Sequence, residues 1–128
     1  MLGKQEKNWK TRYDQNDQWF QDQTAKYKSK GIRLIVIFAH TGNANPVFRA
    51  IQRYSSISKI PILYFNGNGH FFKVMQHREN FVRLQVDRGG IAQPLKVSIA
   101  GDGRSTSVKK NDFQFFSGMV GVARQWNV

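Results

Sequence analysis

Apolar residues in the first third of the chain follow first a helical and then a strand-like pattern. Over residues 8–28, aromatic side chains recur at helical spacing among Lys, Gln and Asp. This spacing predicts an amphipathic helix that packs against a sheet, with residues 15–17 as a candidate interruption. Gly31 can end the helix in the left-handed conformation. Residues 32–39 then form a nearly continuous β-branched apolar run, typical of a parallel strand covered on both faces.

A second helix and a second strand are predicted next. Asn45 is a good helix N-cap and Pro46 suits the first helical position, so we expect a helix over residues 46–55. Residues 60–65 are again apolar and predict a strand. The three elements make a β-α-β unit, for which parallel strands and a right-handed crossover are expected.

Beyond residue 70 the pattern changes to short strands. Residues 81–86 and 95–99 alternate apolar and polar, as half-buried strands do, and residues 105–110 predict an exposed loop. The tail, residues 104–128, becomes apolar from Phe113 and either packs here as a strand or contacts another molecule. The predicted fold class is α/β in a single domain: a helical segment over residues 1–30, one β-α-β unit, then mostly antiparallel short strands.

Composition narrows the classes of function. The absence of cysteine removes disulfides, thiolate metal sites and thiol catalysis. No apolar run approaches the ~18 residues of a membrane span and no signal peptide is apparent, which favours an intracellular or organellar location. Twenty Lys and Arg against eight Asp and Glu give a net charge of +12. Such a charge attracts nucleic acid, anionic lipid or an acidic partner, although without a dense block a solvated basic surface is favoured.

Each strand of the β-α-β unit ends in a glycine-containing loop with a histidine. Parallel strands end at the same sheet edge, where the N-terminus of the helix that begins at Pro46 also favours an anion. The sequence therefore predicts an anion or metal pocket at this edge. Its candidate metal ligands are His40, Asn68 and His70, and its candidate phosphate-loop residues are Thr41, Gly42, Asn43, Gly67 and Gly69.

The order of these motifs resembles the C-terminal half of calcineurin-like metallophosphoesterases, over about residues 31–99. It comprises a strand ending in His40, a helix, a Pro-Ile-Leu-Tyr-Phe strand and Gly-Asn-Gly-His70, followed by Val-Arg-Leu-Gln-Val-Asp87 and Pro-Leu-Lys-Val. The resemblance implies half of an α/β sandwich. It places His40 at the isolated histidine ligand, Asn68 at the first histidine of Gly-His-x-His and His70 at the second. It also implies a divalent metal (Mn, Fe or Zn) that activates water against a phosphoester.

The chain departs from this family before Gly31. The family's N-terminal half supplies Asp-x-His, Gly-Asp and Gly-Asn-His motifs, which have no counterpart here. A two-metal mechanism needs carboxylates that bridge the ions. The leading hypothesis is therefore a non-catalytic metallophosphoesterase-like domain that serves as a structural or interaction subunit. Another chain, or a second copy of this one, would cover its open sheet face.

Two other functions stay open. In the first, another chain completes the site and makes it a metal-dependent phosphoester hydrolase. In the second, the protein is a basic module that binds nucleic acid or phosphate.

Three structural alternatives also stay open. The Asn-Gly pairs of residues 66–69 favour a hairpin between residues 62–65 and 70–74. His77 is expected in a surface loop. Phe71 and Phe72 either pack in the core or stack on bases.

Overall fold

The computed structural model describes residues 3–42, 45–90, 92–101, 106–110 and 113–117, the last range as backbone only. Two helices and seven strands lie in this part of the chain. In chain order they are α1 (Lys4–Lys28), β1 (Ile35–Phe38), α2 (Pro46–Ser58), β2 (Ile62–Asn66), β3 (Lys73–Arg78), β4 (Phe81–Gln85), β5 (Leu95–Ile99), β6 (Thr106–Lys110) and β7 (Phe113–Ser117).

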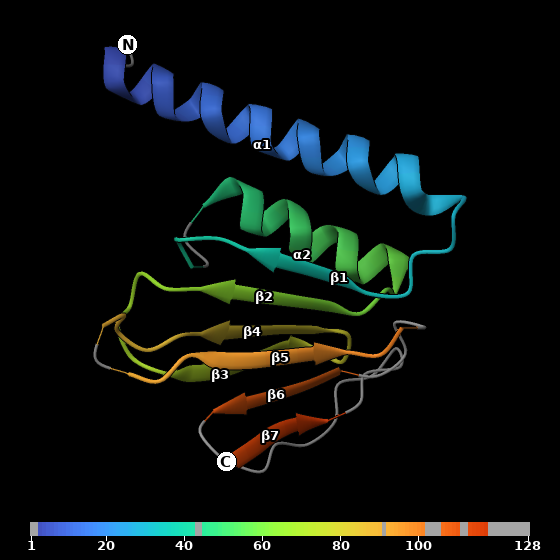
Figure 1. Cartoon of the computed structure of the whole chain (residues 1–128). Coiled ribbons are helices and arrows are strands. Elements are labelled where there is room, and N and C mark those ends of the chain that lie inside the picture. Colours follow the sequence, from blue (N-terminus) through green and yellow to red (C-terminus); the bar gives the residue numbers. More distant parts are fainter. Residues whose placement is uncertain (1–2, 43–44, 91, 102–105, 111–112, 118–128) are drawn as a thin grey trace.

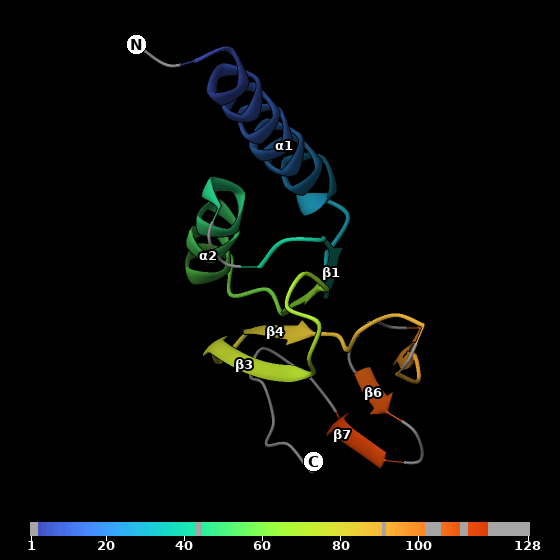
Figure 2. The same cartoon turned by 90° about the vertical axis from the view of Figure 1, so that its left-hand side faces the viewer.

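These elements form three layers (Figure 1). The four-stranded sheet has the order β1-β2-β4-β3, in which β1, β2 and β4 are parallel and β3 is antiparallel to β4. The antiparallel sheet β5-β6-β7 forms a second layer. Figure 2 shows the helices on one side of the four-stranded sheet and the second sheet on the other. The predicted α/β class is confirmed, as are the parallel strands of the β-α-β unit.

The core follows the alternation of side chains along β2. Ile62 and Tyr64 pack against the helices, in a cluster that includes Phe48, whereas Leu63 and Phe65 pack against the second sheet. Neighbouring β4 alternates in the same way, with Phe81 toward the helices and Val82 toward the second sheet. Because both strands lie inside the sheet and both of its faces are covered, every residue of β2 and β4 is buried.

Three predictions about exposure are therefore wrong. Residues 81–85 are not half-buried, because β4 is a central strand whose polar positions are enclosed as well. The sheet face expected to be open is covered by Leu95, Val97 and Val108 of the second sheet. Residues 106–110 are not an exposed loop but the middle strand β6, with Thr106 and Val108 buried.

The predicted hairpin between β2 and its following segment does not form. β4 lies between β2 and β3, so the turn at Asn68 and Gly69 carries the chain to the outer edge of the sheet. The tight connection is instead the one from β3 to β4, at Glu79 and Asn80. Residues 113–117 pair with β6 as β7, the strand alternative for the tail. Residues 118–128 lie outside the described residues.

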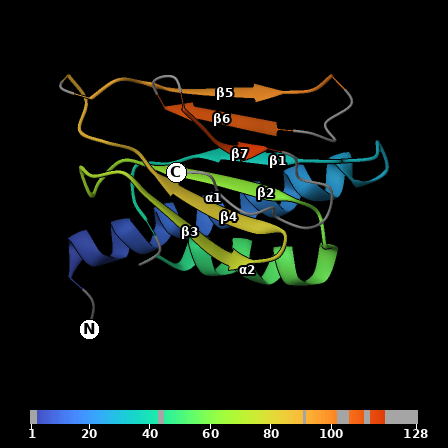
Figure 3. The same ribbon diagram turned by 90° about the horizontal axis from the view of Figure 1, so that it is seen from below.

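Helix α1 is continuous through residues 15–17, where an interruption was a candidate. Gln18 donates to Asp22 (2.8 Å) and Gln21 to Asp17 (3.0 Å), which are i,i+4 pairs that favour the helix. We expected this helix to pack against a sheet, but its C-terminal half packs on helix α2, where Phe20 meets Tyr54 edge to face at 5.4 Å. The N-terminal half extends past the start of α2, on the side where β1, β2 and β4 end (Figure 3).

Helix α2 begins at the predicted N-cap and runs three residues beyond its predicted end. Asn45 Oδ1 accepts a hydrogen bond from the Phe48 backbone N–H (2.9 Å), and its Nδ2 donates to the Gly42 carbonyl (3.0 Å). The helix ends at Ser58, because Lys59 takes the left-handed conformation (φ 60°) that closes the last turn.

Replacing the N-cap tests this account. Asn45→Ala removes the acceptor of the Phe48 N–H and is expected to lower the free energy of unfolding by about 1–2 kcal/mol. Urea denaturation followed by circular dichroism measures the change. The matched control, Gln52→Ala in the same helix, should stay within about 0.5 kcal/mol. Equal effects of the two variants would contradict the capping role.

Candidate anion-binding site

A pocket of about 320 Å³ opens at the edge of the four-stranded sheet where β1, β2 and β4 end. It brings together parts of the chain that are far apart in sequence: α1, the loop after β1, the start of α2, the loop after β2, and strands β3 and β4. No Asp or Glu of the described ranges lines it. The lining residues are Tyr13, Thr41, Gly42, Asn45, Asn68, Gly69, Phe71, Lys73, Met75, Arg83 and Gln85.

The two predicted loops meet at this edge. The His40 carbonyl accepts hydrogen bonds from the backbone N–H groups of Gly67 (3.1 Å) and Asn68 (3.0 Å). The Tyr64 hydroxyl donates to the Thr41 carbonyl (2.8 Å), and burial raises the pKa of this hydroxyl despite opposing contributions from Asn45 and Arg83. The loops after β1 and β2 are thus fixed to each other through the backbone.

Arg83 of β4 lies at the centre of the site. Its side chain points to the helix-facing side, and only 6% of the residue is exposed. Nη1 donates to Asn66 Oδ1 (3.3 Å) and Nε to His77 Nε2 (3.4 Å), both neutral acceptors. The two ion pairs among the described residues, Lys10–Asp14 and Lys110–Asp87, do not involve it. Burial lowers the pKa of Arg83, but a guanidinium remains protonated in proteins. Arg83 is therefore a buried charge that has no anionic partner among the described residues.

A hydrogen-bonded polar layer surrounds the guanidinium at the ends of β2 and β4. Asn66 Nδ2 donates to Asn68 Oδ1 (3.0 Å) and to Gln85 Oε1 (3.2 Å), and Gln85 Nε2 donates to the Phe71 carbonyl (3.0 Å). Asn66 and Gln85 are buried, so these bonds satisfy groups that would otherwise be costly to enclose. The layer ties the β2–β3 loop to the floor of the pocket.

Two of the predicted glycines lie against this layer. A Cβ at position 42 would stand 2.5 Å from Arg83 Nη1, and a Cβ at position 69 would overlap the Gln85 side chain. These glycines were predicted to let a phosphate approach the backbone closely. In the structure they allow the loops to contact Arg83 and Gln85 directly.

Of the three predicted metal ligands, Asn68 alone lines this pocket. The His40 and His70 side chains are exposed and neither lines the pocket, while Asn68 Oδ1 already accepts from Asn66. In the part of the chain that the structure describes, no three His, Cys, Asp or Glu side chains lie close enough to hold an ion. The described residues therefore do not supply the ligand set of a divalent metal.

Three of the five predicted phosphate-loop residues, Thr41, Gly42 and Gly69, line the pocket. Gly67 lies beside it, packed against Val86, and Asn43 lies outside the described residues.

No family model, curated protein or solved structure matches this chain. These comparisons neither support nor contradict the resemblance to metallophosphoesterases, so the assignment of the site depends on its geometry. Within the described residues, neither helix is long and apolar enough to cross a membrane.

The most important residues of the site, Asn66, Arg83 and Gln85, were not among the predicted site residues. Their signal was the polar positions within apolar strands, as in Phe-Val-Arg-Leu-Gln of β4. We interpreted that alternation as exposure of one face. In a strand that is buried on both faces, the polar side chains at those positions lie inside the protein and form a cluster.

The prediction for His77 was also wrong, because His77 lies in strand β3 and not in a surface loop. Its ring lies half-buried between Phe48 (5.2 Å between centroids) and Phe81 (5.4 Å), beside Arg83. Burial, and secondarily the charge of Arg83, lowers the pKa of His77 below its usual 6.5.

The loop contact at Gly42 can be tested by adding one methyl group. Gly42→Ala pushes on the buried guanidinium and is expected to lower the free energy of unfolding by about 1–3 kcal/mol. Gly89→Ala is the control, because no atom lies within 4 Å of a Cβ there. Denaturant melts of the two variants should differ. A Gly42→Ala protein as stable as the control would show that the contact is not tight.

The burial of His77 predicts a pH dependence of stability. Because the folded state disfavours protonated His77, the unfolded chain binds protons more readily, and stability should decrease as pH falls from about 6.5 through the lowered pKa. His77→Gln keeps an acceptor for Arg83 but does not titrate. We expect a smaller loss of stability between pH 7 and pH 5 in this variant, measured by urea melts. Parallel curves for the variant and the wild type would refute the assignment.

Proposed function

We propose that this protein is a binding module for phosphate-bearing ligands and that the pocket at Arg83 holds the phosphate. The observation that carries the proposal is the buried guanidinium, which has no carboxylate partner among the described residues. Enclosing an unpaired charge is costly, and an anion in the pocket would offset that cost. The planar fork of donors on Arg suits phosphate oxygens.

Other groups in the pocket favour the same ligand. Lys73 adds a second cation. The Thr41 hydroxyl accepts a hydrogen bond from Asn45 Nδ2 (3.2 Å) and keeps its own proton to donate to an anion. The N-terminus of α2 lies here too, where the helix dipole favours negative charge. The net charge of +12 raises the local concentration of anions around the whole molecule.

The metallophosphoesterase-like alternatives have less support. Both would use this edge of the sheet for phosphate, but they also need metal ligands that the described residues do not bring together. The interaction-subunit hypothesis was based partly on an open sheet face, and that face is covered. A binding role needs neither feature.

The test is a titration with inorganic phosphate in the presence of EDTA, followed by calorimetry. Arg83→Met should weaken binding at least tenfold, because a hydrogen bond to a charged group contributes about 1.5–3 kcal/mol. The variant should remain folded, since apolar replacement of a buried charge is often neutral or stabilising.

Arg88→Met is the matched control, because Arg88 is exposed and does not line this pocket. It removes the same charge and should bind phosphate as the wild type does. Equal affinities of the two variants would refute the role of Arg83. Binding that disappears with EDTA would instead favour a metal-dependent site.

A further inference from the structure

Two aromatic side chains from different elements line the phosphate pocket. Tyr13 comes from α1, and Phe71 comes from the loop after β2. Phe71 is 55% exposed, so packing does not account for most of its surface. Inorganic phosphate cannot stack on an aromatic ring, whereas a nucleic-acid base can. The pair therefore suggests which molecule carries the phosphate.

An aromatic and basic surface continues from Tyr13 toward the N-terminus of α1. Trp9 is 56% exposed and stacks on Tyr13, with 6.3 Å between ring centroids and an interplanar angle of 30°. The Arg12 guanidinium lies 5.7 Å from the Trp9 ring. This half of the helix extends beyond the start of α2, on the side where β1, β2 and β4 end (Figure 3).

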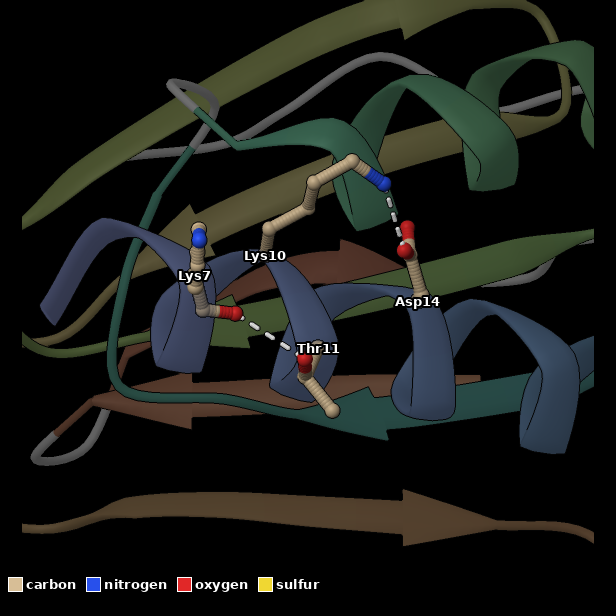
Figure 4. A network of polar contacts seen from close by, with 4 residues as sticks. All are labelled: Lys7, Lys10, Thr11 and Asp14. Carbon is tan, nitrogen blue, oxygen red and sulfur yellow. Dashed lines mark hydrogen bonds and ion pairs between the residues drawn. The ribbon is translucent and has the colours of Figure 1, made fainter. Parts of the chain in front are cut away.

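Local contacts keep this part of α1 ordered. Lys10 pairs with Asp14 at 2.7 Å, and the Thr11 hydroxyl donates to the Lys7 carbonyl at 2.9 Å (Figure 4). Glu6 also accepts from the Gly3 backbone N–H (2.8 Å) at the start of the helix. The rings of Trp9 and Tyr13 are thus presented on a regular helix.

We propose that the ligand is single-stranded nucleic acid, with one backbone phosphate at Arg83 and neighbouring bases stacked on Tyr13 and on Phe71. The inference depends on the proposed phosphate-binding function and adds the bases to it. Two stacking surfaces on different elements suit successive bases of a strand. The charge of +12 also exceeds what one nucleotide would neutralise. A duplex fits less well, because its base faces are already stacked inside the helix.

The test measures fluorescence anisotropy of a labelled oligothymidylate and of an abasic oligomer of equal length. Tyr13→Ala and Phe71→Ala should each weaken binding of the oligothymidylate by about 5- to 100-fold, the range for loss of one stacked base. Affinity for the abasic oligomer and for inorganic phosphate should not change, because the phosphate contacts remain. Tyr13→Phe and Phe71→Tyr keep an aromatic face and should bind as the wild type does.

Tyr27→Ala is the matched control. Tyr27 lies at the other end of α1, with Lys26 and Lys30 near its ring, but it does not line this pocket. It should leave all affinities unchanged. Circular dichroism of each variant confirms that α1 and the sheets remain folded.

The outcomes separate the two proposals. If the abasic oligomer binds as tightly as the oligothymidylate, or if both alanine variants bind like the wild type, base stacking is refuted while phosphate binding at Arg83 stands. Equal affinity for thymidine monophosphate, or tighter binding of a duplex, would also overturn a single-stranded ligand. If Arg83→Met alters neither phosphate nor oligonucleotide binding, the proposed function itself is wrong.

Discussion

Enclosure of β2 and β4 on both faces is the constraint on which the rest of this structure depends. Five consecutive residues in each strand are buried, so each strand needs one apolar layer above it and another below. Helices α1 and α2 supply the first layer and the sheet β5-β6-β7 supplies the second. The hydrophobic effect favours this arrangement because neither layer alone removes both faces from water.

Because β2 and β4 are covered on both faces, the polar residues in these strands are buried as well. Asn66, Arg83 and Gln85 cannot turn toward solvent, so their hydrogen bonds must be made inside the protein. Asn66 bonds to both of the others, and Gln85 reaches back to the Phe71 carbonyl. These bonds fix the loops that follow β1 and β2. The neutral amides satisfy one another, whereas the charge of Arg83 is left without an opposite charge among the described residues.

The position of that charge links the fold to the proposed function. Parallel strands β1, β2 and β4 end at one edge, and the N-terminus of α2 lies at the same edge. Ligands of open α/β sheets commonly bind at this place, because the loops there diverge and backbone donors face outward. Tyr13 of α1 also lines the pocket. Helix α1 belongs to the helical layer, whereas Arg83 belongs to the sheet. Arg83 and Tyr13 therefore share one pocket only because the helical layer packs on this face of the sheet.

The sequence by itself determined much of the local structure. Asn45 and Pro46 predicted the start of α2, Gly31 predicted the end of α1, and the apolar runs predicted parallel β1 and β2 with a shared edge for Thr41, Gly42, Asn68 and Gly69. These features depend on capping, backbone conformation and short-range periodicity, which adjacent residues control. Only the tertiary structure decided that β4 enters between β2 and β3, and that β5–β7 cover the sheet. The same long-range pairing enclosed Arg83 and His77. Burial depends on which distant segments pack together, and the alternation of residues along one strand does not specify its neighbours.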